Sequence, residues 1–199
     1  LHMMPVNHIA GVGMTGVYGL YVGGTLVFQD RFEAGDLLRL LEEERIDHLL
    51  GSPVQFHMMG NHPDLKTRDL SHMKFMTWGG APMAADLTAR LNELPCALHT
   101  SYGMTELGLY VTFTEPGTSF DALSQTIGKP HHGFDIRVAD GEGNLAGPGE
   151  EGEIQARGDW LLAGYFRDPQ ATAEAYTADG WFRTGDIVKV WEDGNLEIV

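Results

Sequence analysis

The first part of the chain alternates between short apolar runs and longer segments in which apolar residues recur at helical spacing. Residues 34–45 place four leucines on one stripe opposite charged side chains, which predicts an amphipathic helix. Two more helices are predicted at residues 53–59, which begin with a proline, and at residues 83–94. The apolar runs that predict strands are residues 48–51, 73–78 and 97–101. Strands and helices that alternate at this spacing predict an α/β fold, with a parallel sheet and flanking helices.

A run without charged residues extends from residue 9 to residue 28. Its length approaches that of a membrane span. Glycines interrupt the run and no Lys or Arg flanks its start, so we expect a buried helix followed by a strand at residues 25–29. No basic segment typical of a signal peptide precedes it. We therefore expect no transmembrane segment.

The pattern changes at about residue 122, where helical spacing gives way to short apolar runs between turns rich in Gly and Asp. The runs that predict strands are residues 134–138, 153–156, 187–191 and 196–199. Hairpin turns are predicted at residues 140–144 and 192–195, and one short helix at residues 168–175. We expect two subdomains, an α/β subdomain over residues 1–122 and a β-rich subdomain over residues 123–199.

The composition limits the classes of partner that this chain is expected to bind. The 199-residue chain has a formal net charge of -15, which argues against nucleic acid because that partner requires a basic surface. A small anion would need local attraction from a divalent cation, a helix N-terminus or backbone N–H groups. The single cysteine, Cys96, has no second cysteine with which to form an internal disulfide and no accompanying His or Asp motif. We expect a small buried side chain rather than a catalytic thiol, and a reduced, cytoplasmic location.

Three glycine-containing strings carry groups suited to nucleotide chemistry. They are Gly-Gly-Ala-Pro at 79–82, Tyr-Gly-Met-Thr-Glu at 102–106 and Arg-Thr-Gly-Asp at 183–186. Tyr102 offers a flat ring to an aromatic base, Glu106 offers a hard oxygen ligand to Mg²⁺, and Asp186 offers two acceptor oxygens to the hydroxyls of a ribose. Each residue also has a structural explanation: a core tyrosine, a first-turn helix glutamate or a turn aspartate. The first two strings follow predicted parallel strands, whose carboxyl ends meet at one edge of a sheet.

With two further strings, these motifs resemble those of the adenylate-forming superfamily, which includes acyl- and aryl-CoA synthetases, luciferases and the adenylation domains of peptide synthetases. Pro5-Val6-Asn7-His8-Ile9-Ala10-Gly11 is similar to its Pro-x-x-His-x-x-Gly element, and residues 152–158 with Gly164-Tyr165 are similar to its later Gly-Glu motif. The similarity runs from end to end. It implies the second half of the large N-terminal domain of such an enzyme, in which a parallel sheet with flanking helices is followed by a β-rich, barrel-like subdomain.

The resemblance implies that a carboxylic acid attacks the α-phosphate of ATP, with Mg²⁺ bound, and releases pyrophosphate. Coenzyme A then captures the acyl group and AMP leaves. The catalytic residues implied are His8 beside the acid, Thr105 donating to a phosphate oxygen, and Glu106 as the metal ligand. A helix N-cap is the structural alternative for Thr105. The residues implied in nucleotide binding are Gly79, Gly80, Ala81, Pro82, Ser101, Tyr102, Gly103, Met104, Thr105 and Asp186.

Three departures from the pattern of the superfamily narrow the expected substrate. Thr100 stands where many relatives carry Asn or Gln, so that side chain is not expected to contact adenine. His8 stands in the early motif, where amino-acid-activating domains carry an Asp, which disfavours amino acids. Gly103 stands where acetyl-CoA synthetases carry Trp, which favours a longer or aryl acid. The implied activity is that of an AMP-forming acid:CoA ligase for medium-chain, long-chain or aromatic carboxylates.

Two alternatives stay open: transfer of the acyl group to a carrier-protein thiol, and a non-catalytic module that binds nucleotide or serves as a scaffold. The phosphate loop of the superfamily is expected upstream of Pro5, and its small C-terminal domain beyond Val199. Removal of one preorganised electrostatic group commonly lowers a rate about 10²- to 10³-fold. We therefore expect the chain alone to be inactive, with the N- and C-terminal parts of the same enzyme as its partners.

Overall fold

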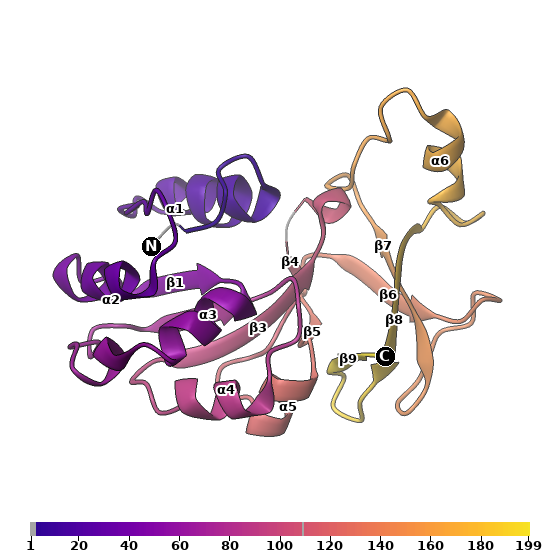
Figure 1. Cartoon of the computed structure of the whole chain (residues 1–199). Coiled ribbons are helices and arrows are strands. Elements are labelled where there is room, and N and C mark those ends of the chain that lie inside the picture. The colour runs from indigo at the N-terminus through magenta and orange to yellow at the C-terminus, as the bar shows by residue number, and fades with distance from the viewer. Residues whose placement is uncertain (1–2, 109) are drawn as a thin grey trace.

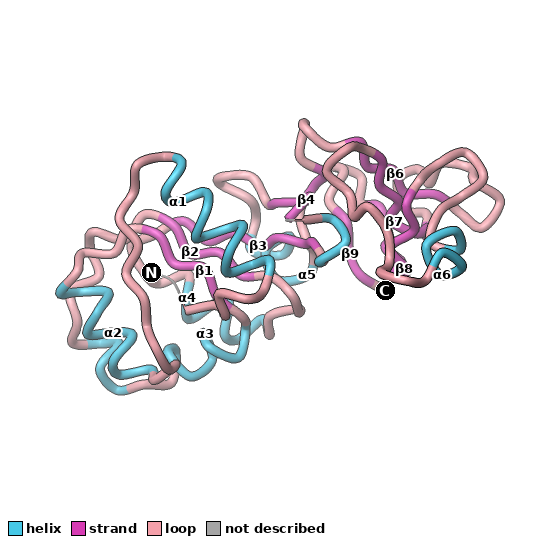
Figure 2. The backbone as a smooth tube through the Cα atoms, turned by 90° about the horizontal axis from the view of Figure 1, so that it is seen from above, coloured by secondary structure: helices cyan, strands magenta, loops and turns pink. Residues whose placement is uncertain are grey.

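The computed structural model describes residues 3–108 and 110–199, which form two lobes that follow one another along the chain (Figure 1). The first lobe contains a five-stranded sheet in the order β1-β2-β3-β4-β5. The second contains a four-stranded sheet in the order β6-β7-β8-β9. Seen from above, most of the helices surround the first lobe (Figure 2).

The first sheet is parallel only in part. Strands β1 (His48–Gly51), β2 (Phe75–Trp78) and β3 (Ala97–Gly103) are parallel, as predicted. Two strands that were not predicted, β4 (Tyr110–Phe113) and β5 (Lys129–Pro130), extend the sheet in the antiparallel sense. The predicted third strand ended at residue 101, whereas β3 runs two residues further. The Tyr-Gly pair at 102–103 therefore forms the end of this strand.

Local caps fix the helices of this lobe. The α2 helix (Ala34–Glu43) begins after Glu33, whose carboxylate accepts two backbone N–H groups, and α3 (Pro53–Gly60) begins with a capping box. Other helical segments of this lobe are η2 (Pro63–Lys66), α4 (Ala85–Leu91) and α5 (Phe120–Gln125). Helices and strands enclose a core whose fully buried large side chains include Trp78, Phe56, Leu37, Leu38, Met76 and Leu91.

The uncharged run near the N-terminus is helical but not buried. It forms the π-helix η1 (Ala10–Val17) followed by the single turn α1 (Tyr18–Tyr21). The predicted burial is wrong, because Leu20 and Val17 are exposed and Tyr21 is 87% exposed. The predicted strand at 25–29 is also wrong, since only Phe28 takes part in an isolated bridge. Within the described ranges, no helix is both long and apolar enough to cross a membrane. The cytoplasmic location stays a prediction.

The second lobe is an antiparallel sheet that curls around its own core (Figure 1). Its strands are β6 (Asp135–Ala139), β7 (Glu151–Arg157), β8 (Phe182–Val190) and β9 (Leu196–Ile198). One short helix, α6 (Pro169–Glu174), is capped by Asp168 in agreement with the prediction. Strand β8 begins five residues before the predicted strand, which started at residue 187. The Arg-Thr-Gly-Asp string therefore lies within a strand.

Backbone hydrogen bonds join the lobes where the chain passes from one sheet to the other. The Ile127 N–H donates to the Leu196 carbonyl at 2.8 Å, and the Leu196 N–H donates to the Gly128 carbonyl at 2.9 Å. The change of sheet along the chain falls between β5 and β6, at residues 130–135. The division into subdomains at residue 122 stays a prediction.

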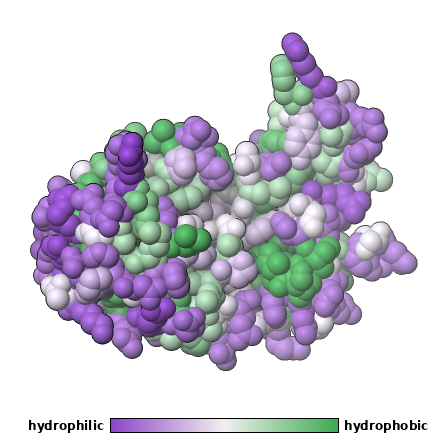
Figure 3. All heavy atoms as spheres, in the orientation of Figure 1, coloured by the Kyte–Doolittle hydropathy of each residue, from purple (hydrophilic) through white to green (hydrophobic). Residues whose placement is uncertain are grey.

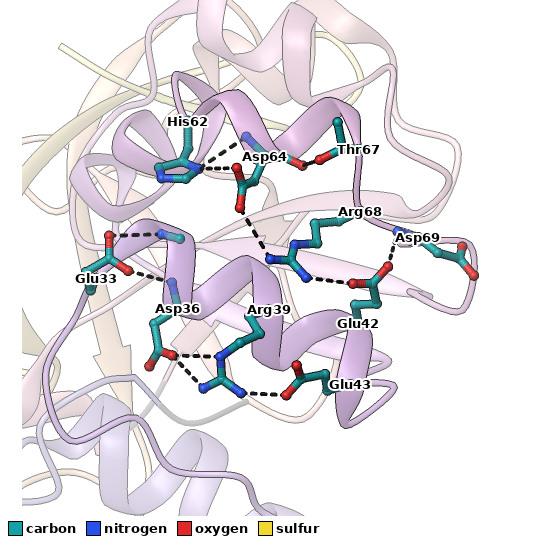
Figure 4. A network of polar contacts seen from close by, with 11 residues as sticks. Glu33, Asp36, Arg39, Glu42, Glu43, His62, Asp64, Thr67, Arg68 and Asp69 are labelled. Atoms are coloured by element: carbon teal, nitrogen blue, oxygen red, sulfur yellow. Dashed lines mark hydrogen bonds and ion pairs between the residues drawn. The ribbon is translucent and has the colours of Figure 1, made fainter.

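A polar network on the outside of the first lobe ties a loop to α2 (Figure 4). The Arg68 guanidinium pairs with Glu42 on α2 and with Asp64 on η2. The Glu42 carboxylate also accepts the Asp69 N–H at 2.8 Å, and these bonds lower the pKa of Glu42. Since none of these residues lines a cavity described below, we interpret the network as a structural support.

Candidate functional site

A cavity of about 180 Å³ opens at the carboxyl ends of β2 and β3, where parallel strands usually place their ligands. Its lining combines the N-terminal segment, the loop after β2, the end of β3 with the two residues that follow it, and one residue of β4. The lining residues are Met4, His8, Ile9, Ala10, Gly79, Gly80, Gly103, Met104, Thr105 and Tyr110. Residues from three of the sequence motifs therefore meet in one place.

The two glycines after β2 have different structural roles. A Cβ on buried Gly79 would lie 2.9 Å from the Ser101 hydroxyl and from the Tyr110 ring, so Gly79 permits close packing between strands. Gly80 has a φ of +82° and open space where a Cβ would be, so it serves the turn and keeps the wall of the cavity thin. Ser101 is buried and its hydroxyl donates to the Trp78 carbonyl at 3.0 Å. Ala81 and Pro82 are exposed and lie outside the lining.

Tyr102 connects the two lobes. Its side chain packs in the core of the second lobe, and the residue is 9% exposed. Its hydroxyl donates to Asp186 Oδ2 at 2.5 Å, across 84 positions of sequence. Burial, followed by the hydrogen bond to Asp186, raises the pKa of Tyr102, so the hydroxyl stays protonated at neutral pH. The structure thus brings together the predicted adenine-binding and ribose-binding residues.

Asp186 is presented by an irregularity in β8. Gln155 on β7 pairs with Arg183, and Glu153 pairs with Ile187, so β8 advances by four positions while β7 advances by two. The extra residues form a bulge that includes Gly185, whose φ is +79°. The Asp186 N–H donates to the Thr184 hydroxyl at 3.1 Å, which in turn donates to the Ile154 carbonyl at 2.8 Å. A bulge of this kind redirects one side chain out of the regular alternation of a strand.

Thr105 and Glu106 lie on η3 (Thr105–Leu107), a single turn directly after β3. The residue before the turn is Met104 and its side chain makes no capping bond, so Thr105 is not the N-cap. Thr105 is exposed and lines the cavity. The Glu106 carboxylate is half-buried and accepts from the Tyr165 hydroxyl at 3.2 Å.

The surroundings of Glu106 suit a magnesium ion that is held mainly by its ligand. Mg²⁺ is usually bound by one or two carboxylates together with phosphate oxygens and water. Among the described residues, no group of three or more His, Cys, Asp or Glu side chains is placed to hold a metal alone. Among the hydrogen bonds described, the Tyr165 hydroxyl is the one side-chain partner of the Glu106 carboxylate, so the donor set fits a metal that arrives with a polyphosphate.

Tyr110, Met4, Ile9 and Ala10 line the cavity without having been predicted as site residues. These residue types are common in protein cores, so the sequence gives no sign that they line a cavity, and only the fold shows it. Cys96 is outside the lining, and burial raises the pKa of its thiol to about 11. Very little thiolate is present at neutral pH, which agrees with a structural side chain.

Comparison with known proteins adds to this geometry. Residues 1–166 match the family described as AMP-binding enzyme. The chain belongs to this family. It is 34% identical to a feruloyl-CoA synthase of Amycolatopsis sp over 98% of the chain, and 31% identical to 4-coumarate–CoA ligase-like 6 of Oryza sativa subsp. japonica over 100% of the chain. It spans 39% and 33% of the lengths of these two AMP-binding relatives.

A solved structure agrees with the architecture. The crystal structure of ATP-bound MatB from Rhodopseudomonas palustris superposes with a TM-score of 0.88 and 28% sequence identity. The superposition covers 99% of this chain and 39% of that one. The fold class predicted from the sequence, a parallel sheet with flanking helices followed by a β-rich, barrel-like subdomain, is therefore confirmed, with the addition of the antiparallel strands β4 and β5 to the first sheet.

Proposed function

We propose that the protein is an ATP-dependent, AMP-forming acid:CoA ligase that activates an aromatic or a medium- to long-chain carboxylic acid. The observation that carries this proposal is the convergence of the family motifs on one cavity. His8, Gly80 and Thr105 line it. Tyr102, the neighbour of the lining residue Gly103, binds Asp186 on the other lobe. The relatives named as CoA ligases support the reaction class.

The side chains can be assigned to parts of the substrates. Asp186 accepts hydrogen bonds from the ribose hydroxyls, and the strand end around Tyr102 with the Gly79–Gly80 turn receives the adenine. The Thr105 hydroxyl donates to a phosphate oxygen, and Glu106 holds Mg²⁺, which neutralises phosphate charge when it is bound. His8 borders the carboxylate of the acid. Such local attraction is required because the net charge of -15 repels ATP.

The lining of the cavity and the names of the relatives bear on which acid is activated. Ile9, Met104 and Tyr110 supply apolar surface to the cavity wall, which suits an apolar acyl group. The two relatives are named for feruloyl and 4-coumarate groups, so among the candidate acids we favour aromatic ones.

Pyrophosphate exchange tests the proposal. The full-length protein should exchange labelled pyrophosphate into ATP when an aromatic acid such as ferulate or 4-coumarate is supplied. Glu106→Gln should slow the exchange about 10²- to 10³-fold, because it removes a preorganised charge, while stability changes little. Glu174→Gln is a matched control, since Glu174 is exposed on α6 and accepts only from Gln170 among the hydrogen bonds described. Absence of exchange with a broad panel of acids would defeat the proposal.

The acceptor thiol is tested separately. Release of AMP that depends on CoA supports the ligase, whereas an acyl-adenylate that transfers only to a carrier protein supports an acyl-AMP ligase instead. Binding of AMP without exchange in the full-length protein would point to a non-catalytic nucleotide-binding module. The three results are mutually exclusive, so a single series of assays separates them.

A further inference from the structure

A buried carboxylate lies beneath the β8 bulge that presents Asp186. Glu153 on β7 is 9% exposed, and it is the only buried Asp or Glu among the residues that the structure describes. Its Oε1 accepts the Gly185 N–H at 3.0 Å. Its Oε2 accepts from Arg183 Nε at 3.1 Å and from Gln155 Nε2 at 3.2 Å. Both oxygens are therefore satisfied by groups in or next to the bulge.

The bulge needs this carboxylate because it departs from the regular ladder. At the bulge, the backbone N–H of Gly185 is turned toward the Glu153 side chain and away from a carbonyl of β7. Gly185 itself is exposed, and the negative charge of its acceptor makes this hydrogen bond stronger than a neutral one. Glu153 supplies the acceptor, and the Thr184 hydroxyl supports the bulge through the Ile154 carbonyl. Two neighbouring residues of β7 thus hold the segment 184–186 in its irregular shape.

We propose that Glu153 is a positioning residue for nucleotide binding. It holds the β8 bulge in the conformation that presents the Asp186 carboxylate, and so determines how strongly the protein binds the ribose hydroxyls. This inference rests on the proposed function, in which Asp186 receives the ribose. Desolvation makes a buried carboxylate costly, and an apolar residue would stabilise an ordinary strand at this position more readily.

The carboxylate cannot be replaced by an amide without loss at the bulge. A glutamine at position 153 has one acceptor oxygen and one NH₂ donor, while Glu153 faces donors at both ends. The side with the charged Arg183 and the Gln155 amide attracts the oxygen more strongly. The NH₂ group of Glu153→Gln would then face the Gly185 N–H, so the substitution removes the anchor of the bulge while it keeps the side-chain volume.

The experiment compares two nucleotides that differ only at the ribose. Binding of AMP and of 2′,3′-dideoxy-AMP to the full-length protein is measured by titration calorimetry, for the wild type and for Glu153→Gln. The variant should bind AMP about tenfold more weakly, which corresponds to one hydrogen bond of about 1.4 kcal/mol. Binding of dideoxy-AMP should be nearly unchanged, because that ligand lacks the hydroxyls that Asp186 receives.

Glu197→Gln is the matched control. It is the same chemical change in the same sheet, on a carboxylate that accepts from Trp191 Nε1 at 2.7 Å and does not contact the bulge. Its affinity for both nucleotides should equal that of the wild type. In the full enzyme, Glu153→Gln should raise KM for ATP and leave kcat nearly unchanged, whereas a general loss of structure would lower both affinity and kcat.

The possible results separate the two proposals. If the wild type does not prefer AMP over dideoxy-AMP, the assignment of Asp186 fails, and the role of Glu153 fails with it. If the wild type has this preference but Glu153→Gln keeps it, only the role of Glu153 is overturned. If Glu153→Gln does not fold, Gly185→Ala distorts the bulge from its other side, since the added Cβ meets open space and only the φ of +79° is strained. An unchanged preference for AMP in Gly185→Ala would also overturn the inference.

Discussion

The two lobes place their functional groups by different means. In the first lobe, His8, Gly80 and Thr105 meet because the chain reaches one edge of a sheet at the carboxyl ends of β2 and β3. In the second lobe, Asp186 lies inside a strand and depends on a bulge that is anchored by a buried carboxylate. The topology of a parallel sheet supplies the first arrangement. The second requires specific side chains, which makes it more sensitive to single substitutions.

The lobes also differ in how they are held together. The first has a core built from helices packed on strands, whereas the core of the second lies within a curled sheet and includes Tyr102 from the first. Hydrophobic surface appears in patches over both lobes (Figure 3). The polar contacts that join the lobes include the backbone bonds at 127–128, the bond from Tyr102 to Asp186, and two bonds to Glu106 from Leu162 and Tyr165. Substitutions at these positions therefore test whether the lobes behave as one unit.

The largest effect is expected at Gly128, where the lobes meet. A Cβ at this position would lie 2.0 Å from the Phe113 carbonyl carbon and 2.4 Å from the Thr114 nitrogen, and the φ is +80°. Gly128→Ala should therefore force the backbone apart and lower the free energy of unfolding by more than about 4 kcal/mol. Chemical denaturation monitored by circular dichroism measures the change.

Gly117→Ala provides the control for this prediction. Gly117 has a similar φ of +81°, but nothing lies within 4 Å of an added Cβ. Only the backbone preference is lost, so a cost of about 1 kcal/mol is expected. Equal costs for the two variants would show that the junction between the lobes can relax. Two separate unfolding transitions in Gly128→Ala would show that the lobes fold independently.

The contrast between the two lobes also explains which parts of the structure could be predicted from the sequence. The alternation of apolar and helical segments predicted α2, β1 and α3 closely, because each element has its own spacing and caps. The exposure of η1 and α1 could not be predicted, since an apolar sequence reveals its preference for burial and not the surface that would cover it. The start of β8 was missed because Gly185 was interpreted as a turn glycine, whereas it forms a bulge.

The residues of the candidate site also differ in whether the sequence reveals them. His8, Thr105, Glu106 and Asp186 were predicted because they stand at the positions of the family motifs, and their roles stay predictions. Tyr110 was missed because a tyrosine in an apolar run carries no sign of its role. Glu153 belonged to a recognised motif, yet its contact with the Gly185 N–H depends on a register shift that no sequence pattern shows.

The next largest effect concerns nucleotide affinity. Asp186→Asn should weaken AMP binding about 10- to 100-fold, because charge-assisted hydrogen bonds of about 1.5–3 kcal/mol become neutral ones. Asp193→Asn is the control, since Asp193 lies in the same lobe and bonds only Asn195 among the hydrogen bonds described. Calorimetry with AMP measures both. Equal affinities of the two variants would remove Asp186 from the proposed site.

A smaller effect is expected for Tyr102→Phe, which removes one of the side-chain bonds between the lobes and keeps the ring. The free energy of unfolding should fall by about 1 kcal/mol. AMP affinity should be maintained or increase, because Asp186 no longer accepts from the hydroxyl. A loss of affinity as large as that of Asp186→Asn would show that the hydroxyl itself contacts the nucleotide.

Tyr102→Phe should also change how the stability of the protein depends on pH. Burial and Asp186 raise the pKa of Tyr102 in the folded protein above its unfolded value of about 10. The unfolded state therefore loses its proton first, and the stability that depends on the neutral hydroxyl is present below pH 10 and declines as the pH rises above it. Tyr102→Phe should reduce this alkaline loss of stability, as measured by unfolding between pH 9 and pH 11.

The smallest effect is expected for the exposed ion pairs of α2. Arg39 pairs with Asp36 and Glu43 on its own helix, and all three side chains are exposed to water (Figure 4). Such pairs contribute little because water and salt screen them. Arg39→Ala should therefore leave the midpoint of denaturation within the scatter of repeated measurements, while Arg68→Ala, which unties the η2 loop from α2, should lower it measurably. A large loss in Arg39→Ala would mean that an exposed carboxylate pair matters as much as the buried Glu153, and the contrast between a supporting surface network and a buried anchor would not hold.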